Sequence, residues 1–263
     1  MPEYANARVL IYDNRQEMID AFCRHLVELG QDAIRRHGRF ALALTGGRTP
    51  GPFYERLAEK PYRDQLEWSN VRIFFGDERC VPPDDDASNY KLARERLLSR
   101  VPLSEKSIFR MPADDPDHAR AARAYEAALE RELNLNTLGI PAFDLVLLGV
   151  GEDGHIASIF PGTEATRARD RHVMFNHVEK LGAWRMTLTY PVLNAARHVW
   201  ILATDAGKRE IAARALGHLP GGNVLPIWHV RPADGRLVWW LSSEAAALIP
   251  PEEQDRPEGE DEV

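Results

Sequence analysis

Six short apolar runs, separated by longer segments of helical periodicity, dominate the pattern along the chain. The runs are rich in aliphatic, β-branched or aromatic residues and cover 8–12, 40–44, 71–75, 143–148, 198–203 and 236–241. Between them, apolar residues recur at amphipathic helical spacing over 15–37, 88–99, 116–133 and 206–216. Apolar strands that alternate with helices are typical of a mostly parallel sheet covered on both faces. The pattern predicts a single α/β domain over residues 1–250, with a doubly wound, Rossmann-like sheet.

Capping residues support two of the predicted helix starts. The stretch "DNRQEM", residues 13–18, supplies polar side chains directly before the first long helical segment. Ser88 precedes the second such segment, and serine is favoured as an N-cap because its hydroxyl accepts a hydrogen bond from a free backbone N–H.

The negative charge of the chain is concentrated at one end. The formal net charge is −7, and residues 251–263 carry seven acids and a single arginine. This segment has almost no apolar residues, which predicts a solvated, disordered tail. The remainder is close to neutral, which argues against general nucleic-acid binding. It still allows a local basic pocket for a small anion.

Composition narrows the compartment and the possible cofactors. No apolar run is long enough to span a membrane, and the N-terminus has no basic-then-apolar leader. Cys23 and Cys80 are too few for a disulfide framework and lack metal-ligand spacing. We therefore expect a cytoplasmic protein, a monomer or small homo-oligomer, without a metal, another cofactor or a membrane partner.

In a sheet of this kind, ligands bind at the carboxyl ends of the strands, so the loops that follow the strands are the candidate sites. The first such loop is "TGGRTP", residues 45–50. The backbone amides of Gly46 and Gly47, the Thr45 hydroxyl and the Arg48 side chain suit a phosphate. A tight turn without a ligand is the alternative.

The loop "GDER" follows the third apolar run. Asp77, Glu78 and Arg79 lie where charge is costly unless it is paired or used in a site. A salt-bridged loop explains Glu78 as well as a functional role does.

Glycines in the loop after residue 148 match the dinucleotide-binding pattern G-x-G-x-x-G. They are Gly149, Gly151 and Gly154. However, a dinucleotide fingerprint usually opens the first βαβ unit and continues into a long helix. Here the motif lies past the middle of the chain, and Pro161 and Gly162 follow closely. The context therefore argues against a dinucleotide.

Chemistry in this loop is then expected from His155. A histidine exchanges protons near neutral pH, and the adjacent Asp153 can orient it and favour its charged form. A structural histidine is the alternative. Farther along, Arg185 and Lys208 offer positive charge for a phosphate, or are surface charges. We predict Lys208 in the first turn of a helix, where a bound anion would offset its conflict with the helix dipole.

Four segments together resemble the 6-phosphogluconolactonases, within a larger group that includes the glucosamine-6-phosphate isomerases. The segments are "LTGGRTP", "FFGDERCVPPDDDASN", "LLGVGEDGHIASIFPGT" and "RMTLTYPVLNAARHVWILATDAGK". The resemblance implies metal-free hydrolysis of the phosphosugar lactone 6-phospho-D-glucono-1,5-lactone, the second step of the oxidative pentose phosphate pathway. It implies His155 as the base that activates water. The implied catalytic set is His155, Asp153 and Arg79, and the implied substrate- and phosphate-binding set is Thr45, Gly46, Gly47, Arg48, Asp77, Gly151, Arg185 and Lys208.

Two other functions on the same fold compete with this interpretation. The isomerase pattern has a catalytic acid directly before the Pro-Gly of the third segment, and here Phe160 stands at that position. A phenylalanine cannot transfer protons, and GDER also differs from the D-E-Y of the isomerases. A non-catalytic sugar-phosphate sensor would normally carry a DNA-binding extension, for which we find no sequence. The presence of both His155 and Arg79 also favours an enzyme.

Overall fold

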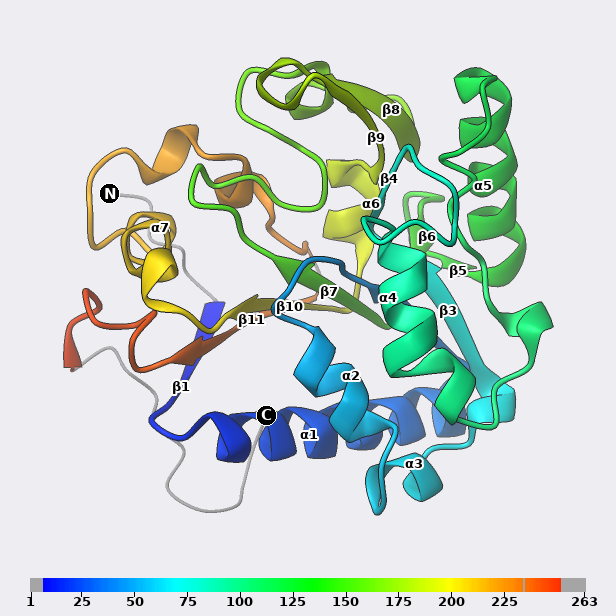
Figure 1. The fold of residues 1–263 in the computed structure, drawn as a ribbon, viewed down its shortest axis with the longest axis horizontal. Coiled ribbons are helices and arrows are strands. Elements are labelled where there is room, and N and C mark those ends of the chain that lie inside the picture. Colours follow the sequence, from blue (N-terminus) through cyan, green and yellow to red (C-terminus); the bar gives the residue numbers. More distant parts are fainter. Residues whose placement is uncertain (1–6, 234, 252–263) are drawn as a thin grey trace.

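Six parallel strands form the central sheet in the computed structural model, which describes residues 7–233 and 235–251. The strands are β1 (Ala7–Tyr12), β2 (Phe40–Leu44), β3 (Val71–Phe75), β7 (Leu145–Gly149), β10 (His198–Ala203) and β11 (Arg236–Ser242). Their order is β1-β11-β10-β7-β2-β3 (Figure 1), and all five pairings are parallel. The predicted fold class is confirmed, and each apolar run corresponds to one strand.

Helices cover both faces of this sheet because every central strand is apolar on both sides. Phe22 of α1 (Arg15–His37) makes edge-to-face contacts with Trp200 and Trp240. The strand register places Trp200 on one face of the sheet and Phe74 on the other. Phe74 contacts Tyr125 of α5 (His118–Glu132), so α5 covers the face opposite to α1. Burial of such aromatic side chains is a large source of stability.

Shorter elements complete the chain. The other helices are α2 (Gly51–Leu57), α3 (Tyr62–Gln65), α4 (Asn89–Arg96), α6 (Tyr190–Ala195) and α7 (Arg209–Ala215). The 3₁₀ turns are η1 (Trp68–Asn70), η2 (Leu98–Arg100), η3 (Glu105–Ser107), η4 (Glu164–Thr166), η5 (Glu179–Leu181), η6 (Ala206–Lys208), η7 (Gly222–Val224) and η8 (Pro226–His229). A two-stranded ribbon pairs β5 (Asn134–Leu135) with β6 (Pro141–Ala142).

The capping predictions are confirmed, and one helix start is corrected. The Asn14 side chain accepts hydrogen bonds from two amides of the first turn of α1, and the Ser88 hydroxyl accepts one from Lys91. The segment predicted to be a helix from residue 206 begins instead with η6, and α7 starts at Arg209. Lys208 is therefore the residue that precedes α7 and does not lie in its first turn.

A second, antiparallel sheet lies beyond the carboxyl ends of the main strands (Figure 1). It has the order β4-β9-β8 and consists of β4 (Asp77–Arg79), β8 (Val173–Val178) and β9 (Ala183–Leu188). The amide of Leu188 donates to the carbonyl of Gly76, which joins this sheet to the end of β3. The sequence did not predict it, because β4 is short and charged and β8 includes polar residues. The second sheet forms a wall above the loops that carry the candidate site.

One buried carboxylate, Asp144, links several elements at the amino-terminal ends of the main strands. Asp144 accepts hydrogen bonds from the amide of Ala41 and from Arg197 before β10, and it lies within ion-pair distance of His37 at the end of α1. Burial raises the pKa of Asp144, and these three partners lower it in part. The contact ties two regions far apart in the sequence, the α1–β2 connection and the residue before β10, to the start of β7.

The acidic tail and the domain boundary at residue 250 stay predictions from the sequence. The acidic tail lies outside the described residues from position 252 onward. Within residues 7–233 and 235–251, no helix has the length and apolar character needed to cross a membrane.

Candidate active site

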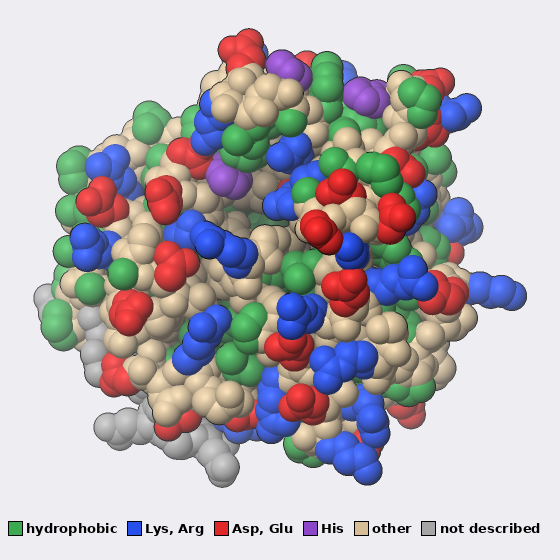
Figure 2. All heavy atoms as spheres, in the orientation of Figure 1, with side chains coloured by type: hydrophobic (Ala, Val, Ile, Leu, Met, Phe, Trp, Pro, Cys, Tyr) green, Lys and Arg blue, Asp and Glu red, His purple; other side chains and the backbone are tan. Residues whose placement is uncertain are grey.

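A cleft of about 610 Å³ opens at the carboxyl ends of β2, β7 and β10, between the main sheet and the second sheet. Lys and Arg side chains gather around the hollow in Figure 2. Nine of the eleven predicted site residues line it: His155, Arg79, Thr45, Gly46, Gly47, Arg48, Asp77, Gly151 and Lys208. Loops far apart in the sequence therefore meet at one site, as parallel strand topology requires.

A tight turn after β7 presents His155 to the cleft. The amide of Gly151 donates to the carbonyl of His155, and the amide of Gly154 donates to the carbonyl of Gly151. Gly154 has φ +77°, a left-handed conformation that glycine adopts without a steric penalty. A Cβ on Gly151 would lie only 2.0 Å from Nδ1 of His155, so the imidazole packs directly on the backbone of Gly151. Gly154 thus allows the tight turn, and Gly151 leaves the space that the imidazole occupies.

Two side chains fix the imidazole ring, one at its edge and one at its face. Asp153 Oδ1 lies 2.5 Å from Nδ1 of His155, and it also accepts from the backbone amide of His155. A carboxylate only accepts, so Nδ1 carries the proton and Nε2 keeps a free lone pair. Phe160 stacks on the ring at a centroid distance of 4.0 Å and an interplanar angle of 19°.

The histidine is neutral at about pH 7. Burial lowers the pKa of His155 to about 4; Asp77 raises it, whereas Lys208, Arg79 and Arg185 lower it further. The charged form expected from Asp153 is therefore not the one favoured, because desolvation and three nearby cations outweigh the carboxylate of Asp77. A neutral imidazole with a free Nε2 is the form that can accept a proton from water.

The GDER loop divides into one residue that holds α4 and two that face the cleft. The Glu78 carboxylate accepts the amides of Arg79, Asn89 and Tyr90, each at 2.8 Å, at the start of α4. Burial raises the pKa of Glu78, and these amides lower it in part. A structural role explains Glu78, while Asp77 and Arg79 line the cleft.

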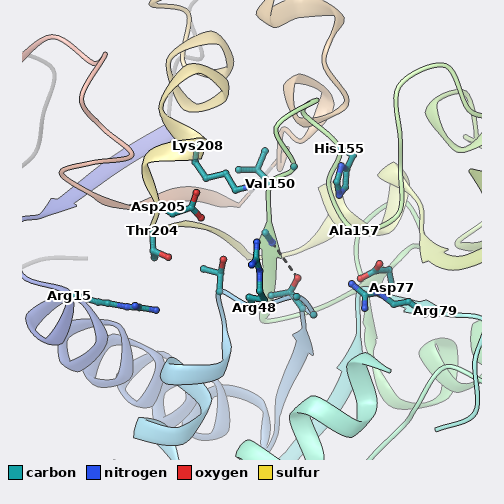
Figure 3. Close-up of a pocket in the computed structure, with 16 residues that line it drawn as sticks. Arg15, Arg48, Asp77, Arg79, Val150, His155, Ala157, Thr204, Asp205 and Lys208 are labelled. Carbon is teal, nitrogen blue, oxygen red and sulfur yellow. Dashed lines mark hydrogen bonds between the residues drawn. The ribbon is translucent and has the colours of Figure 1, made fainter. Parts of the chain in front are cut away.

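The Gly46 loop is held rigidly against its neighbours. A Cβ on Gly46 would lie 1.7 Å from Oδ1 of Asn89, so no larger residue fits there. The Thr45 hydroxyl accepts from the amide of Gly149 at 3.3 Å, which joins the loop after β2 to the end of β7 (Figure 3). The Tyr54 hydroxyl bonds to both the amide and the carbonyl of Thr45. The Gly46 loop is thus preorganised.

Cationic side chains from three elements line the cleft (Figure 3). They are Arg15 of α1, Arg48 of the Gly46 loop and Lys208 of η6. Among the described residues, none of the three forms an ion pair with an acid at 4.0 Å or less. Unpaired cations at a concave surface favour an anionic ligand. The sequence did not single out Arg15 as a site residue. It is the first residue of α1, where a positive charge opposes the helix dipole, and this unfavourable position was the available signal.

Two predicted site residues lie outside the lining of the cleft. Arg185 of β9 pairs in register with Arg79, and its guanidinium donates to the carbonyl of Trp184. Burial and Arg79 lower the pKa of Arg185. It acts on the site as a nearby charge and does not line the cleft, because β9 is the next strand of the second sheet after β4. Asp153 contacts the Nδ1 edge of the imidazole and does not line the cleft.

Lys180 is a further neighbour that the sequence did not reveal. Its ammonium contacts Oδ2 of Asp153 and lies 4.9 Å over the centroid of the Phe160 ring. Lys180 is in η5, far along the chain from the histidine loop, in a segment with no distinctive motif. Over the described ranges, no group of three or more His, Cys, Asp or Glu side chains is arranged to hold a metal ion.

Comparison with known proteins gives a consistent family. The family described as "Glucosamine-6-phosphate isomerases/6-phosphogluconolactonase" matches residues 13–239. A 6-phosphogluconolactonase of Nostoc sp. is 39% identical over 217 residues, which cover 82% of this chain and 88% of the relative. A probable 6-phosphogluconolactonase of Arabidopsis thaliana is 33% identical over 251 residues, which cover 92% of this chain and 93% of the relative. The solved structure of 6-phosphogluconolactonase from Trypanosoma brucei superposes with a TM-score of 0.83 at 32% identity, over 93% of this chain and 99% of that one.

Proposed function

Because the chain belongs to the family of glucosamine-6-phosphate isomerases and 6-phosphogluconolactonases, we propose that it hydrolyses 6-phospho-D-glucono-1,5-lactone to 6-phospho-D-gluconate. This is the second step of the oxidative pentose phosphate pathway. The observation that carries the proposal is a neutral histidine whose free Nε2 faces a cationic cleft, with Phe160 in place of an acid.

The reaction follows from the position of His155. Nε2 takes a proton from a water molecule as its oxygen attacks the lactone carbonyl carbon, and the carbonyl electrons move to the oxygen. When the tetrahedral intermediate collapses, the bond from that carbon to the ring oxygen breaks. The ring oxygen receives the proton from the imidazolium and becomes the C5 hydroxyl, and the new carboxylic acid ionises. Such general base catalysis contributes roughly 10²–10⁴-fold.

Arg79 is the candidate for stabilising the developing oxyanion. It lines the cleft near His155, and its guanidinium is fixed by a 2.6 Å hydrogen bond to the carbonyl of Ala87. Preorganised donors of this kind supply a large part of the stabilisation in acyl transfer. Asp153 holds the tautomer of His155 and is a positioning residue in this mechanism.

The phosphate of the substrate belongs at the opposite end of the cleft. We assign it to the amides of Gly46 and Gly47 together with Arg15, Arg48 and Lys208. This arrangement separates the phosphate group of the substrate from the reacting carbonyl. Binding energy from the phosphate then orients the lactone, which lowers the entropic cost of the reaction.

Phe160 favours the hydrolase over the isomerase branch of the family. An isomerase needs a second proton-transferring group at this position, and a stacked phenyl ring cannot supply one. The ring instead covers one face of the imidazole and keeps water from it. The cytoplasmic location and the monomeric or small oligomeric state expected from the sequence stay predictions.

Acid release from freshly prepared 6-phosphogluconolactone tests the function directly. We expect a rate far above spontaneous hydrolysis, recorded by pH-stat or with an indicator dye. Glucosamine 6-phosphate serves as the second substrate, and ammonia release from it would indicate the isomerase branch. No acceleration of either reaction, together with tight binding of 6-phosphogluconate, would indicate a sugar-phosphate sensor.

Arg15→Gln is expected to raise KM for 6-phosphogluconolactone by roughly tenfold, since a hydrogen bond to a charged group contributes about 1.5 kcal/mol. Hydrolysis of unphosphorylated glucono-1,5-lactone should keep its wild-type kcat/KM, because that substrate has no phosphate to bind. Arg24→Gln is the control, since Arg24 is an exposed arginine on the same helix that does not line the cleft. An equal loss with both lactones would show that Arg15 does not bind the phosphate.

A further inference from the structure

The turn between β8 and β9 reaches the catalytic loop through the side chain of Lys180. Lys180 contacts Oδ2 of Asp153, and the other oxygen of this carboxylate holds Nδ1 of His155. The same ammonium lies over the Phe160 ring, which stacks on the imidazole. One cation therefore contacts both groups that fix the ring of the base, the one at its edge and the one at its face.

We propose that Lys180 is a positioning residue for His155: it holds the Asp153 carboxylate and the Phe160 ring in the arrangement that aims Nε2 into the cleft. This inference rests on the proposed function, in which His155 is the base. It extends the site to the connection between β8 and β9, which contributes Lys180 through η5.

The hairpin is rigid enough to place this side chain. β8 and β9 pair over six residues each, and the amide of Gly182 donates to the carbonyl of Glu179 to close the turn. Gly182 has φ +57°, a left-handed conformation that suits glycine. Lys180 itself is 53% exposed, so the pair with Asp153 is screened and contributes little to global stability. Its effect is expected on geometry and local charge rather than on folding.

Charge around His155 gives the proposal a second measurable consequence. The charged groups that face the imidazole are Asp153 from its own loop, Asp77 and Arg79 from β4, Arg185 from β9, Lys180 from η5 and Lys208 from η6. Without Lys180, the negative charge of Asp153 is no longer compensated at Oδ2. The imidazolium form then gains stability, so the pKa of His155 should rise.

The test compares Lys180→Gln, Lys180→Arg and a control, Lys106→Gln, which removes the same charge from η3 outside the cleft. The acid limb of the kcat/KM profile should move to higher pH by about half a unit to one unit in Lys180→Gln, as expected for the loss of a nearby charge. We expect kcat at the optimum to fall roughly threefold to tenfold as the ring loses its fixed orientation. Lys180→Arg should retain the wild-type profile, because a guanidinium can contact both Asp153 and Phe160.

A titration of the His155 imidazole by NMR, with the signal assigned by comparison with His155→Asn, measures the same pKa without any substrate. Unchanged imidazole pKa and kcat/KM profile in Lys180→Gln would overturn the proposal, and so would a shift of equal size in Lys106→Gln. If the wild-type protein did not hydrolyse the lactone, the proposed function would fail. The NMR titration would still decide whether Lys180 controls His155.

Discussion

His155→Asn is expected to lower kcat/KM for 6-phosphogluconolactone by roughly 10²–10⁴-fold, the usual contribution of a positioned general base. Asparagine is close to histidine in size and can still donate to Asp153, but it cannot take a proton from water. In the wild type, activity should fall as the pH drops toward the pKa of His155, lowered to about 4 by burial, because the imidazole then becomes charged. The variant should lack this acid limb, since the group that titrates is gone. Initial rates across a pH series, corrected for spontaneous hydrolysis, measure both effects.

A second half-buried histidine supplies the matched control. Burial also lowers the pKa of His198 to about 4, but His198 lies at the start of β10 and outside the lining of the cleft. His198→Asn should therefore keep wild-type kcat/KM and the acid limb. Binding of 6-phosphogluconate, measured by calorimetry, should persist in His155→Asn because the phosphate end is unchanged. Near-normal turnover in His155→Asn would show that another group activates the water.

The main sheet was predictable from the sequence because its strands are buried on both faces. Each central strand is a continuous apolar run, as in β2, where all five residues are buried. The second sheet did not give such a signal. β4 has the sequence DER, and its charged side chains are stabilised by partners from other parts of the chain, such as Ser158 and Asn89 at the start of α4. Interactions of this kind depend on the tertiary fold, so local sequence patterns do not reveal them.

The candidate site was predictable where a residue stands in a motif at a strand end. His155, Gly46 and Gly151 follow β7 or β2 directly, and strand topology alone brings their loops together. Lys180 and Arg15 stand in no motif, and only the folded chain places them beside Asp153 and the cleft. The sequence also left open whether Glu78 is structural, a question that its three backbone donors answer.

Gly151→Ala is expected to lower kcat roughly 10²-fold while the protein remains folded. The added methyl carbon would lie 2.0 Å from Nδ1 and 2.1 Å from Cε1 of His155, and 2.8 Å from Oδ1 of Asp153. These distances are far below van der Waals contact, so the imidazole must leave its place. Displacement of a catalytic group by about 1 Å can cost 10²-fold in rate. Overpacking of this type usually costs ~1–3 kcal/mol of stability, which thermal unfolding will measure alongside kcat.

Gly76→Ala and a double variant separate the loss of the base from general strain. A Cβ on Gly76 would meet only the carbonyl of Leu44 at 3.7 Å and Leu148 at 3.9 Å, so activity should stay close to wild type. If Gly151→Ala acts by moving His155, it should have little further effect once His155 is asparagine. The double variant should then be about as active as His155→Asn alone. A multiplied loss would mean that Gly151 serves the reaction in another way, such as through its own approach to the substrate. The two single variants and the double variant thus test whether a glycine is required here to make room for the base.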